Sequence, residues 1–212
     1  MRMKQTDFNR VLAEISSLLE RVRGAAHDLH ASVNQKYDGH LPYSVHLDAV
    51  ASLVRRYGAA VCVSEADVAP LLFGAWFHDS IEDARLTYND VKKTALSLGL
   101  SDGQALMAAE IVYALTNDKG RTRAERAGEK YYAGIRATPY APLVKMADRV
   151  ANVTYSVRCT SAGNRRMRDV YRKEMPKFMA SVSGGSDDVR MAVPEELAAR
   201  AYAALAEGGG AV

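Results

Sequence analysis

The stretch that decides the fold runs from Val68 to Asp83 and reads VAPLLFGAWFHDSIED. Residues 68–77 are all apolar or small, so a helix over them is hydrophobic on every side and belongs in the centre of the protein. Four ionisable residues follow at once: His78, Asp79, Glu82 and Asp83. Such groups are costly to bury without compensation, which a divalent cation would provide. The stretch therefore predicts a central helix that ends at a metal-binding His-Asp pair.

Helical periodicity continues on both sides of this segment. Apolar residues recur at three- and four-residue steps, and Ser64 with Asp67 and Thr87 with Asp90 resemble capping pairs at helix starts. No strand pattern of comparable quality appears, and residues 34–39 read as a polar turn. We predict an all-α helical bundle, with Pro42 opening one helix. Besides the central helix, the expected helices cover residues 8–22 with an extension toward His30, 42–54, 91–98, 101–115, 123–135, 143–157, 164–182 and 194–205.

Length and composition predict one main domain. The chain has 212 residues, of which 48% are hydrophobic and 25% charged, as in ordinary globular proteins. We assign residues 1–182 to this domain and 183–212 to a loop, a short helix and a flexible glycine-rich tail. Cys62 and Cys159 lie far apart without a Cys-x-x-Cys spacing, which favours a reducing cytoplasm. The N-terminus has no continuous apolar run, so we expect neither a signal peptide nor a membrane partner.

Charge is distributed unevenly along the chain. The formal net charge of +3 is too small to indicate a nucleic-acid partner by itself. Residues 65–90 hold six acids and one base, whereas residues 118–149 hold eight bases and four acids. A cation-binding segment beside an anion-binding segment suits a phosphate-bearing small molecule held next to a metal.

Two distant residues complete the expected metal site. On the predicted helix 143–157, Asp148 shares a face with Val144 and Ala151, where an unpaired carboxylate would be destabilising. His46 lies one turn before Val50. A single histidine on an apolar face is more often a hydrogen-bonded core residue, but the combination with Asp148 and the His-Asp pair reverses that preference. The dipeptide His27-Asp28 lacks both the apolar run and the acidic pair, so we expect it to be structural or solvated.

These residues suit hydrolysis of a phosphate ester. A divalent ion lowers the pKa of a bound water from 15.7 toward about 7, and Glu82 or Asp83 would accept the proton. Only three histidines remain outside the set, which favours one metal ion over a multinuclear centre. Four basic residues are candidate phosphate ligands, each with a solvated surface position as the alternative: Lys36, Lys119, Arg149 and Arg168.

Four motifs resemble the HD-domain metal-dependent phosphohydrolases. Residues 41–46 (LPYSVH), 78–83 (HDSIED), 115–119 (LTNDK) and 144–152 (VKMADRVAN) are similar to the family's Pro-Tyr-x-x-His, His-Asp-x-x-Glu-Asp, Thr-Asp-Asp-Lys and Lys-Leu-Ala-Asp-Lys/Arg-x-x-Asn. The resemblance covers residues 30–178. The second motif is similar to the hydrolase domain of RelA/SpoT proteins and to the single-domain metazoan SpoT homologues and small alarmone hydrolases.

The resemblance implies an HD-domain bundle and a set of roles. One manganese ion would be bound by His46, His78, Asp79 and Asp148, and Glu82 with Asp83 would position and deprotonate the attacking water. Lys36, Asn152 and Tyr155 would contact the nucleotide. The implied reaction removes pyrophosphate from the 3′ position of guanosine tetra- or pentaphosphate. Gln35 departs from the pattern, because the family often has a second basic residue there.

Two other interpretations stay open. A monometallic HD nucleotidase acting on another nucleotide would use the same four ligands. A non-catalytic module that binds nucleotides or RNA is suggested by a basic helix, although basic faces are usually only solvated. The bases concerned are Arg165, Arg166, Arg168, Arg172 and Lys173. The base and phosphate number of the substrate, the native metal and the oligomeric state are left open by the sequence.

Overall fold

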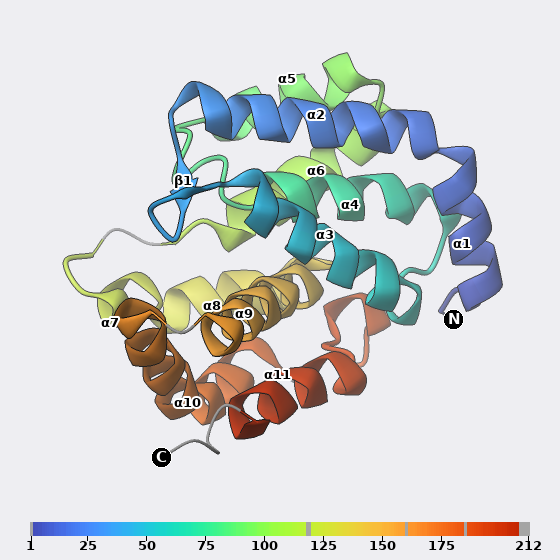
Figure 1. The fold of residues 1–212 in the computed structure, drawn as a ribbon. Coiled ribbons are helices and arrows are strands. Elements are labelled where there is room, and N and C mark those ends of the chain that lie inside the picture. Colours follow the sequence, from blue (N-terminus) through green and yellow to red (C-terminus); the bar gives the residue numbers. More distant parts are fainter. Residues whose placement is uncertain (1, 118–119, 160, 185, 208–212) are drawn as a thin grey trace.

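The computed structural model describes residues 2–117, 120–159, 161–184 and 186–207, which form an all-α bundle, as predicted (Figure 1). The elements, in chain order, are α1 Gln5–Glu14, α2 Ser16–Ser32, β1 Lys36–Tyr37, β2 Leu41–Pro42, α3 Ser44–Tyr57, η1 Gly58–Ala60, η2 Glu65–Asp67, α4 Val68–Phe77, α5 Tyr88–Leu98, α6 Asp102–Leu115, α7 Arg123–Arg126, α8 Glu129–Ala137, α9 Ala141–Arg158, α10 Ala162–Val182, η3 Val189–Met191 and α11 Glu195–Glu207.

Helix α4 is the centre of the bundle. All of its residues are buried, and it packs against α2, α3 and α6, because a helix that is apolar all round has no face to present to water. The preceding turn η2 holds its start in place. There the Asp67 carboxylate accepts hydrogen bonds from the backbone N–H groups of Ser64 (2.7 Å) and Val63 (3.0 Å). The sequence prediction of a central helix that leads into His78 is confirmed.

Helix α9 organises the second half of the molecule. It contacts α3 on one side and α8, α10 and α11 on its others (Figure 1). Helix α11 packs on α9 through one apolar stripe, formed by Leu197, Ala201 and Leu205. The contact between α3 and α9 brings two helices that are about 100 residues apart in sequence to the end of α4, where the candidate site lies.

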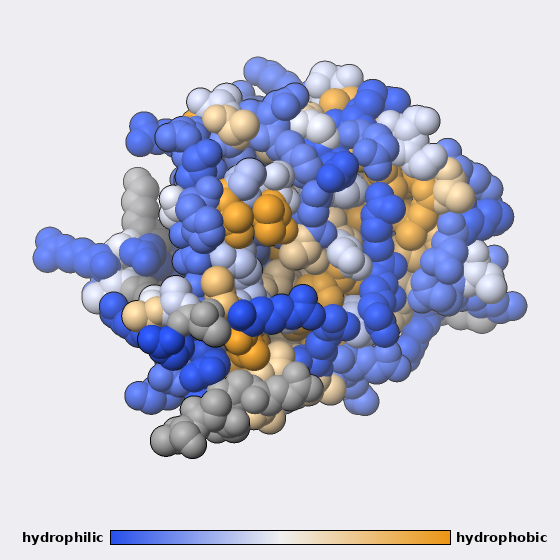
Figure 2. All heavy atoms as spheres, in the orientation of Figure 1, coloured by the Kyte–Doolittle hydropathy of each residue, from blue (hydrophilic) through white to orange (hydrophobic). Residues whose placement is uncertain are grey.

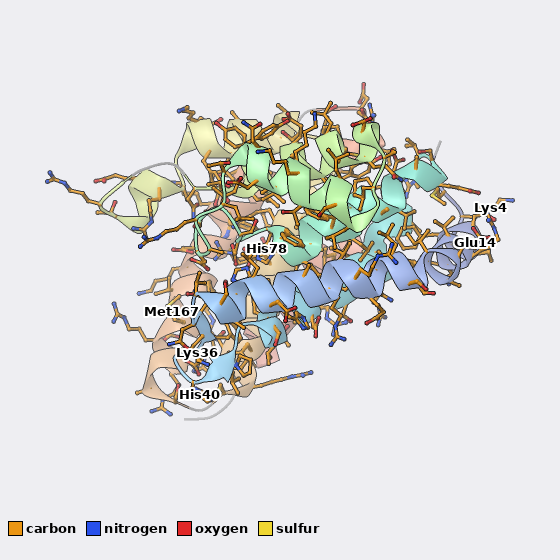
Figure 3. The ribbon with its side chains drawn as sticks, turned by 90° about the horizontal axis from the view of Figure 1, so that it is seen from above. Lys4, Glu14, Lys36, His40, His78 and Met167 are labelled. Atoms are coloured by element: carbon orange, nitrogen blue, oxygen red, sulfur yellow. The ribbon has the colours of Figure 1, made fainter. Side chains whose placement is uncertain are left out.

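A short hairpin lies between α2 and α3. Strands β1 and β2 are antiparallel, with Lys36 opposite Pro42, and Asp38 at the turn has a positive φ of 51°. The Asp38 carboxylate accepts hydrogen bonds from the Tyr155 hydroxyl of α9 (2.9 Å) and the Asn164 amide of α10 (2.8 Å). Figure 3 accordingly shows Lys36 at the same end of the molecule as Met167 of α10. The hairpin tip is therefore bonded to the second half of the bundle.

Several expected boundaries were wrong. The first helix breaks at Ile15, between α1 and α2, and the segment expected as one helix over 123–135 is two, α7 and α8. Residues 34–39, expected as a turn alone, contribute β1 to the hairpin. Pro42 lies in β2, and the next helix begins at Ser44. Helix α9 begins at Ala141, before the expected 143, because Pro142 fits the first turn of a helix.

The surface is mostly polar. Figure 2 shows one face largely covered by hydrophilic residues, with hydrophobic ones exposed in small areas between them. Among the described residues, every helix is too short or too polar to cross a bilayer.

Candidate metal centre

His78 is placed by the end of α4. It is the C-cap of that helix and is 2% exposed. Its Nδ1 lies 2.9 Å from the backbone carbonyl of Ala75, which can only accept, so Nδ1 carries a proton and Nε2 is directed at the other residues of the cluster. This is the usual arrangement for a histidine that binds a metal through Nε2.

Two more donor atoms approach that nitrogen. His46 Nε2, from α3, lies 3.2 Å from His78 Nε2, and Asp79 Oδ2 lies 2.9 Å from His78 Nε2 and 3.8 Å from His46 Nε2. One ligand atom from each of these three residues can be chosen so that all lie within 4.8 Å of one another. His46 is also 2% exposed, so the cluster is buried on its imidazole side.

Asp148 approaches from α9. Its Oδ1 lies 3.4 Å from His46 Nε2. The same carboxylate accepts hydrogen bonds from Asn152 Nδ2 (2.6 Å) and Lys145 Nζ (2.9 Å). The four residues expected to bind a metal thus come from three separate segments and meet at one place, although Asp148 lies at the edge of the tighter cluster formed by the other three.

The donor set fits one divalent cation. The two Nε2 atoms face each other, and the Nδ1 atom of His46 is buried without a hydrogen-bond partner among the described residues. Ligand atoms bound to one ion at about 2.1 Å lie about 3.0 to 3.4 Å apart, which resembles the separations at this site. Two imidazoles with two carboxylates suit manganese, iron, cobalt or zinc, so the donors indicate a metal without specifying which.

The charges of the cluster depend on one another. Burial opposes ionisation of Asp79, but the neighbouring His78 outweighs it and lowers the pKa of the Asp79 carboxyl below its usual range. Burial likewise disfavours the charged form of Asp148, and the Lys145 ammonium lowers the pKa of that carboxyl despite it. Both carboxylates are therefore negative at neutral pH and available to a cation.

Glu82 and Asp83 follow the cluster in a turn. They do not continue the helix, because α4 ends at Phe77. One helical hydrogen bond remains, from the Asp83 N–H to the Asp79 carbonyl (2.9 Å). Glu82 turns toward the end of α6, where the backbone N–H and the side-chain amide of Asn117 both donate to its carboxylate. Glu82 is exposed and Asp83 is half-buried.

A cavity of about 370 Å³ opens at this place. It extends from the cluster toward α8 and α10. Of the expected site residues, seven line it: His46, Asp79, Glu82, Asp83, Asp148, Arg149 and Asn152. His78 is not among the residues that line it.

The remaining expected substrate ligands lie elsewhere. Lys36 and Tyr155 do not line the cavity, because Lys36 is exposed on the hairpin and the Tyr155 hydroxyl donates to Asp38. Arg168, on α10, is also outside the lining, and its Nε is buried without a hydrogen-bond partner among the described residues. Lys119 lies outside the residues that the structure describes.

Arg149 lines the cavity, and its side chain packs against two aromatic rings. Its guanidinium pairs with Glu174 of α10 at 2.9 Å and lies over the rings of Phe178 (4.3 Å) and Tyr171 (5.0 Å). The side chain is 8% exposed. It adds positive charge to the wall from a fixed position, as expected for a planar cation held by stacking.

Sequence reasoning missed several residues that hold the site together. The Tyr43 hydroxyl donates to Asp79 Oδ2. The Tyr37 ring stacks on His46 at 5.0 Å, and its hydroxyl donates to Asn152 Oδ1 (3.0 Å). Lys145 could have been found, because a base three residues before a buried acid lies on the same helix face. The tyrosine contacts have no such local signal.

Comparison with known proteins adds a second line of observation. No protein-family model matches the chain. The chain is 29% identical over 146 residues to a protein of zebrafish (Danio rerio) described as guanosine-3′,5′-bis(diphosphate) 3′-pyrophosphohydrolase MESH1, covering 69% of this chain and 72% of that protein. The mouse (Mus musculus) protein of the same description is 29% identical over 153 residues, or 71% and 75% of the two chains.

The two comparisons support the resemblance to the HD-domain family of SpoT-like small hydrolases that the motifs indicate. In this chain, the cluster of His46, His78 and Asp79 is the candidate metal centre. The family's name refers to a His-Asp pair, which in this chain is His78-Asp79 at the end of α4. The other such dipeptide, His27-Asp28, lies apart from the centre, where His27 Nε2 is 3.0 Å from the Asp48 carboxylate of α3.

Proposed function

We propose that this protein is an HD-domain hydrolase and a manganese-dependent 3′-pyrophosphohydrolase of guanosine 3′,5′-bis(diphosphate) and the related pentaphosphate. The observation that carries the proposal is the convergence of His46, His78, Asp79 and Asp148 beside two further carboxylates in the wall of one cavity. The printed function of the zebrafish and mouse relatives supports the choice of substrate.

In this proposal the four clustered residues hold the cation. When bound, the ion would supply a lowered pKa for a coordinated water and neutralise charge that develops on the phosphoryl oxygens. Glu82 and Asp83, which follow the ligands in the same turn, would orient the attacking water and accept its proton. Burial, with Asp79 and Glu82 nearby, raises the pKa of Asp83 to about 6, which suits a proton acceptor near neutral pH.

The rest of the cavity would hold the nucleotide. Arg149, Lys145 and Lys177 line it and would contact an anionic substrate, with Arg149 also paired to Glu174 and Lys145 to Asp148. Asn152 lies in the same wall and would contact the nucleotide, and Lys36, Tyr155, Arg168 and Lys119 are proposed as further contacts. The two free cysteines, Cys62 and Cys159, suit the reducing conditions of the cytoplasm, which we propose as the compartment.

The test is a product assay. Purified protein with manganese is incubated with guanosine and adenosine 3′-pyrophosphates and with nucleoside monophosphates, and pyrophosphate is measured separately from phosphate. We expect pyrophosphate from the guanosine 3′-pyrophosphates and a loss of at least about a hundredfold in His78→Ala. His27→Ala is the matched control, because it alters the other His-Asp dipeptide and should keep activity.

Two outcomes would contradict the proposal. Release of phosphate from monophosphates, with no pyrophosphate from any 3′-pyrophosphate, would indicate the monometallic nucleotidase. Binding of nucleotide or RNA that is unchanged by chelation, without turnover of any compound, would indicate a non-catalytic binding module.

A further inference from the structure

Each of the two carboxylates that follow the metal cluster is held by a side-chain amide. Gln35 Nε2 donates to Asp83 Oδ2 at 3.1 Å, and Asn117 Nδ2 donates to Glu82 Oε2 at 3.0 Å. Both partners come from outside the turn that carries the carboxylates. Gln35 precedes the hairpin, and Asn117 follows α6.

Gln35 is fixed by its own backbone. Its N–H donates to the His30 carbonyl at the end of α2 (3.0 Å), and Asn34 before it has a φ of 54°, in the left-handed region. Asparagine tolerates this region better than most residues. The half-buried Gln35 side chain is thereby directed at Asp83 and away from the hairpin, where Lys36 is exposed. The departure from the family pattern at position 35 thus lies beside a proposed catalytic carboxylate.

Asn117 holds Glu82 with two donors. Its backbone N–H donates to Oε1 while its side-chain amide donates to Oε2, so both carboxylate oxygens are engaged by one residue. The position of Asn117 is set by the end of α6, where the Thr116 hydroxyl donates to the Val112 carbonyl (3.0 Å). Two donors from one residue fix the orientation of the Glu82 carboxylate as well as its place.

A neutral amide has a particular effect at these positions. An arginine or lysine would hold the carboxylate equally well but would cancel its charge and favour the ionised form strongly. An amide donates a hydrogen bond without bringing charge. Glu82 and Asp83 are therefore held in a fixed orientation without a cation from these two partners, and general-base chemistry requires such an orientation.

We propose that Gln35 and Asn117 are positioning residues, which hold Asp83 and Glu82 in the orientation that hydrolysis requires. The inference rests on the proposed function, since it assigns these two carboxylates to the attacking water. It makes Gln35, at the position that departs from the family pattern, a determinant of turnover.

The test separates turnover from binding. Gln35→Met and Asn117→Leu keep side-chain size but remove the donor, and Gln35→Glu and Asn117→Asp replace the donor with a negative charge. We expect kcat to fall about tenfold in the first pair and a hundredfold or more in the second, with KM within about threefold of the wild type. Manganese content and melting temperature should be unchanged. Gln5→Met, on α1, is the matched control.

A second measurement does not depend on substrate. The side-chain NH₂ signals of Gln35 and Asn117, assigned in ¹⁵N NMR spectra by their loss in the variants, should shift in Asp83→Asn and Glu82→Gln respectively. Unmoved signals would show that the contacts are absent and would overturn the inference. An active wild type with full kcat in all four variants would also overturn it, while leaving the proposed function intact. A wild type inert toward every compound would instead refute the proposed function, and the signals would still decide whether the two contacts exist.

Discussion

The Nε2 atoms of His46 and His78 lie 3.2 Å apart, although the two residues are 32 positions apart in sequence. Both rings are buried, so a cation bound by the two nitrogens would be held away from solvent on this side. We expect one divalent ion per chain. His46→Ala and Asp79→Asn should each weaken manganese binding at least tenfold, measured by titration calorimetry and by metal analysis after dialysis. His40→Ala, on the exposed hairpin, should bind as the wild type does.

Lys145 compensates the buried Asp148. Its ammonium lies 2.9 Å from Asp148 Oδ2, and the two side chains are 17% and 14% exposed. Lys145→Met would leave the carboxylate without its cation, so we expect the metal-free protein to lose about 3 kcal/mol in unfolding free energy. Manganese binding should raise the melting temperature of this variant by more than it raises that of the wild type. Equal melting temperatures of variant and wild type without metal would contradict this account. Lys173→Met, on the exposed face of α10, is the control.

His30 should make stability depend on pH. It is 1% exposed and stacks on Tyr43, and neither ring nitrogen has a hydrogen-bond partner among the described residues. Burial lowers the pKa of His30 to about 4. The nearby Asp79 carboxylate acts to raise this pKa, whereas His78, His46 and His27 lower it further. The unfolded chain takes up this proton near pH 6.5, so the folded state loses stability as the pH falls from 6.5 toward 4.

The corresponding experiment compares the wild type with His30→Phe, which keeps an aromatic ring against Tyr43. Urea unfolding is measured at pH 7.5 and pH 5 without added metal. We expect the wild type to lose about 2 kcal/mol more than the variant between the two conditions. Parallel losses in both proteins would show that His30 does not titrate in this way.

Gly74 sets the distance between α4 and α6. A Cβ at this position would lie 2.5 Å from Ile111 Cγ2, so Gly74→Ala must push the two helices apart. We expect a loss of about 1 to 3 kcal/mol in unfolding free energy, with weaker manganese binding because His78 lies one turn further along α4. Thermal melts and titration calorimetry would measure both. Gly24→Ala on α2 is the matched control. Its Cβ would meet nothing within 4 Å, so we expect it to be neutral or stabilising.

The centre of the fold could be predicted because its signals are local. The unbroken apolar run of α4 is buried throughout, and the capping pair Thr87–Asp90 lies where the pattern placed it. The break at Ile15 could not be predicted, because apolar residues recur at helical spacing on both sides of it. The strands β1 and β2 have two residues each, which is too short for an alternating pattern to be recognised.

Some residues of the candidate site could likewise be predicted from the sequence, and others could not. Apolar faces of α3 and α9 indicated that His46 and Asp148 point inward, and the structure brings them within 3.4 Å of each other. The partners of the carboxylates gave no such indication. Gln35 and Asp83 are 48 positions apart, and Tyr37 and Asn152 are 115 apart. Such pairs depend on how the hairpin and helices approach one another, which periodicity within single segments does not encode.

The bonds from Asp38 to Tyr155 and Asn164 have a consequence for access to the metal centre. They fasten the hairpin at its tip, and Tyr37 within it covers the outer side of His46. The hairpin is thus bonded to α9 and α10 while it covers this imidazole. The cavity beside the cluster is lined in part by residues of α8 and α10, so a ligand in it would lie against those helices and not against the hairpin strands.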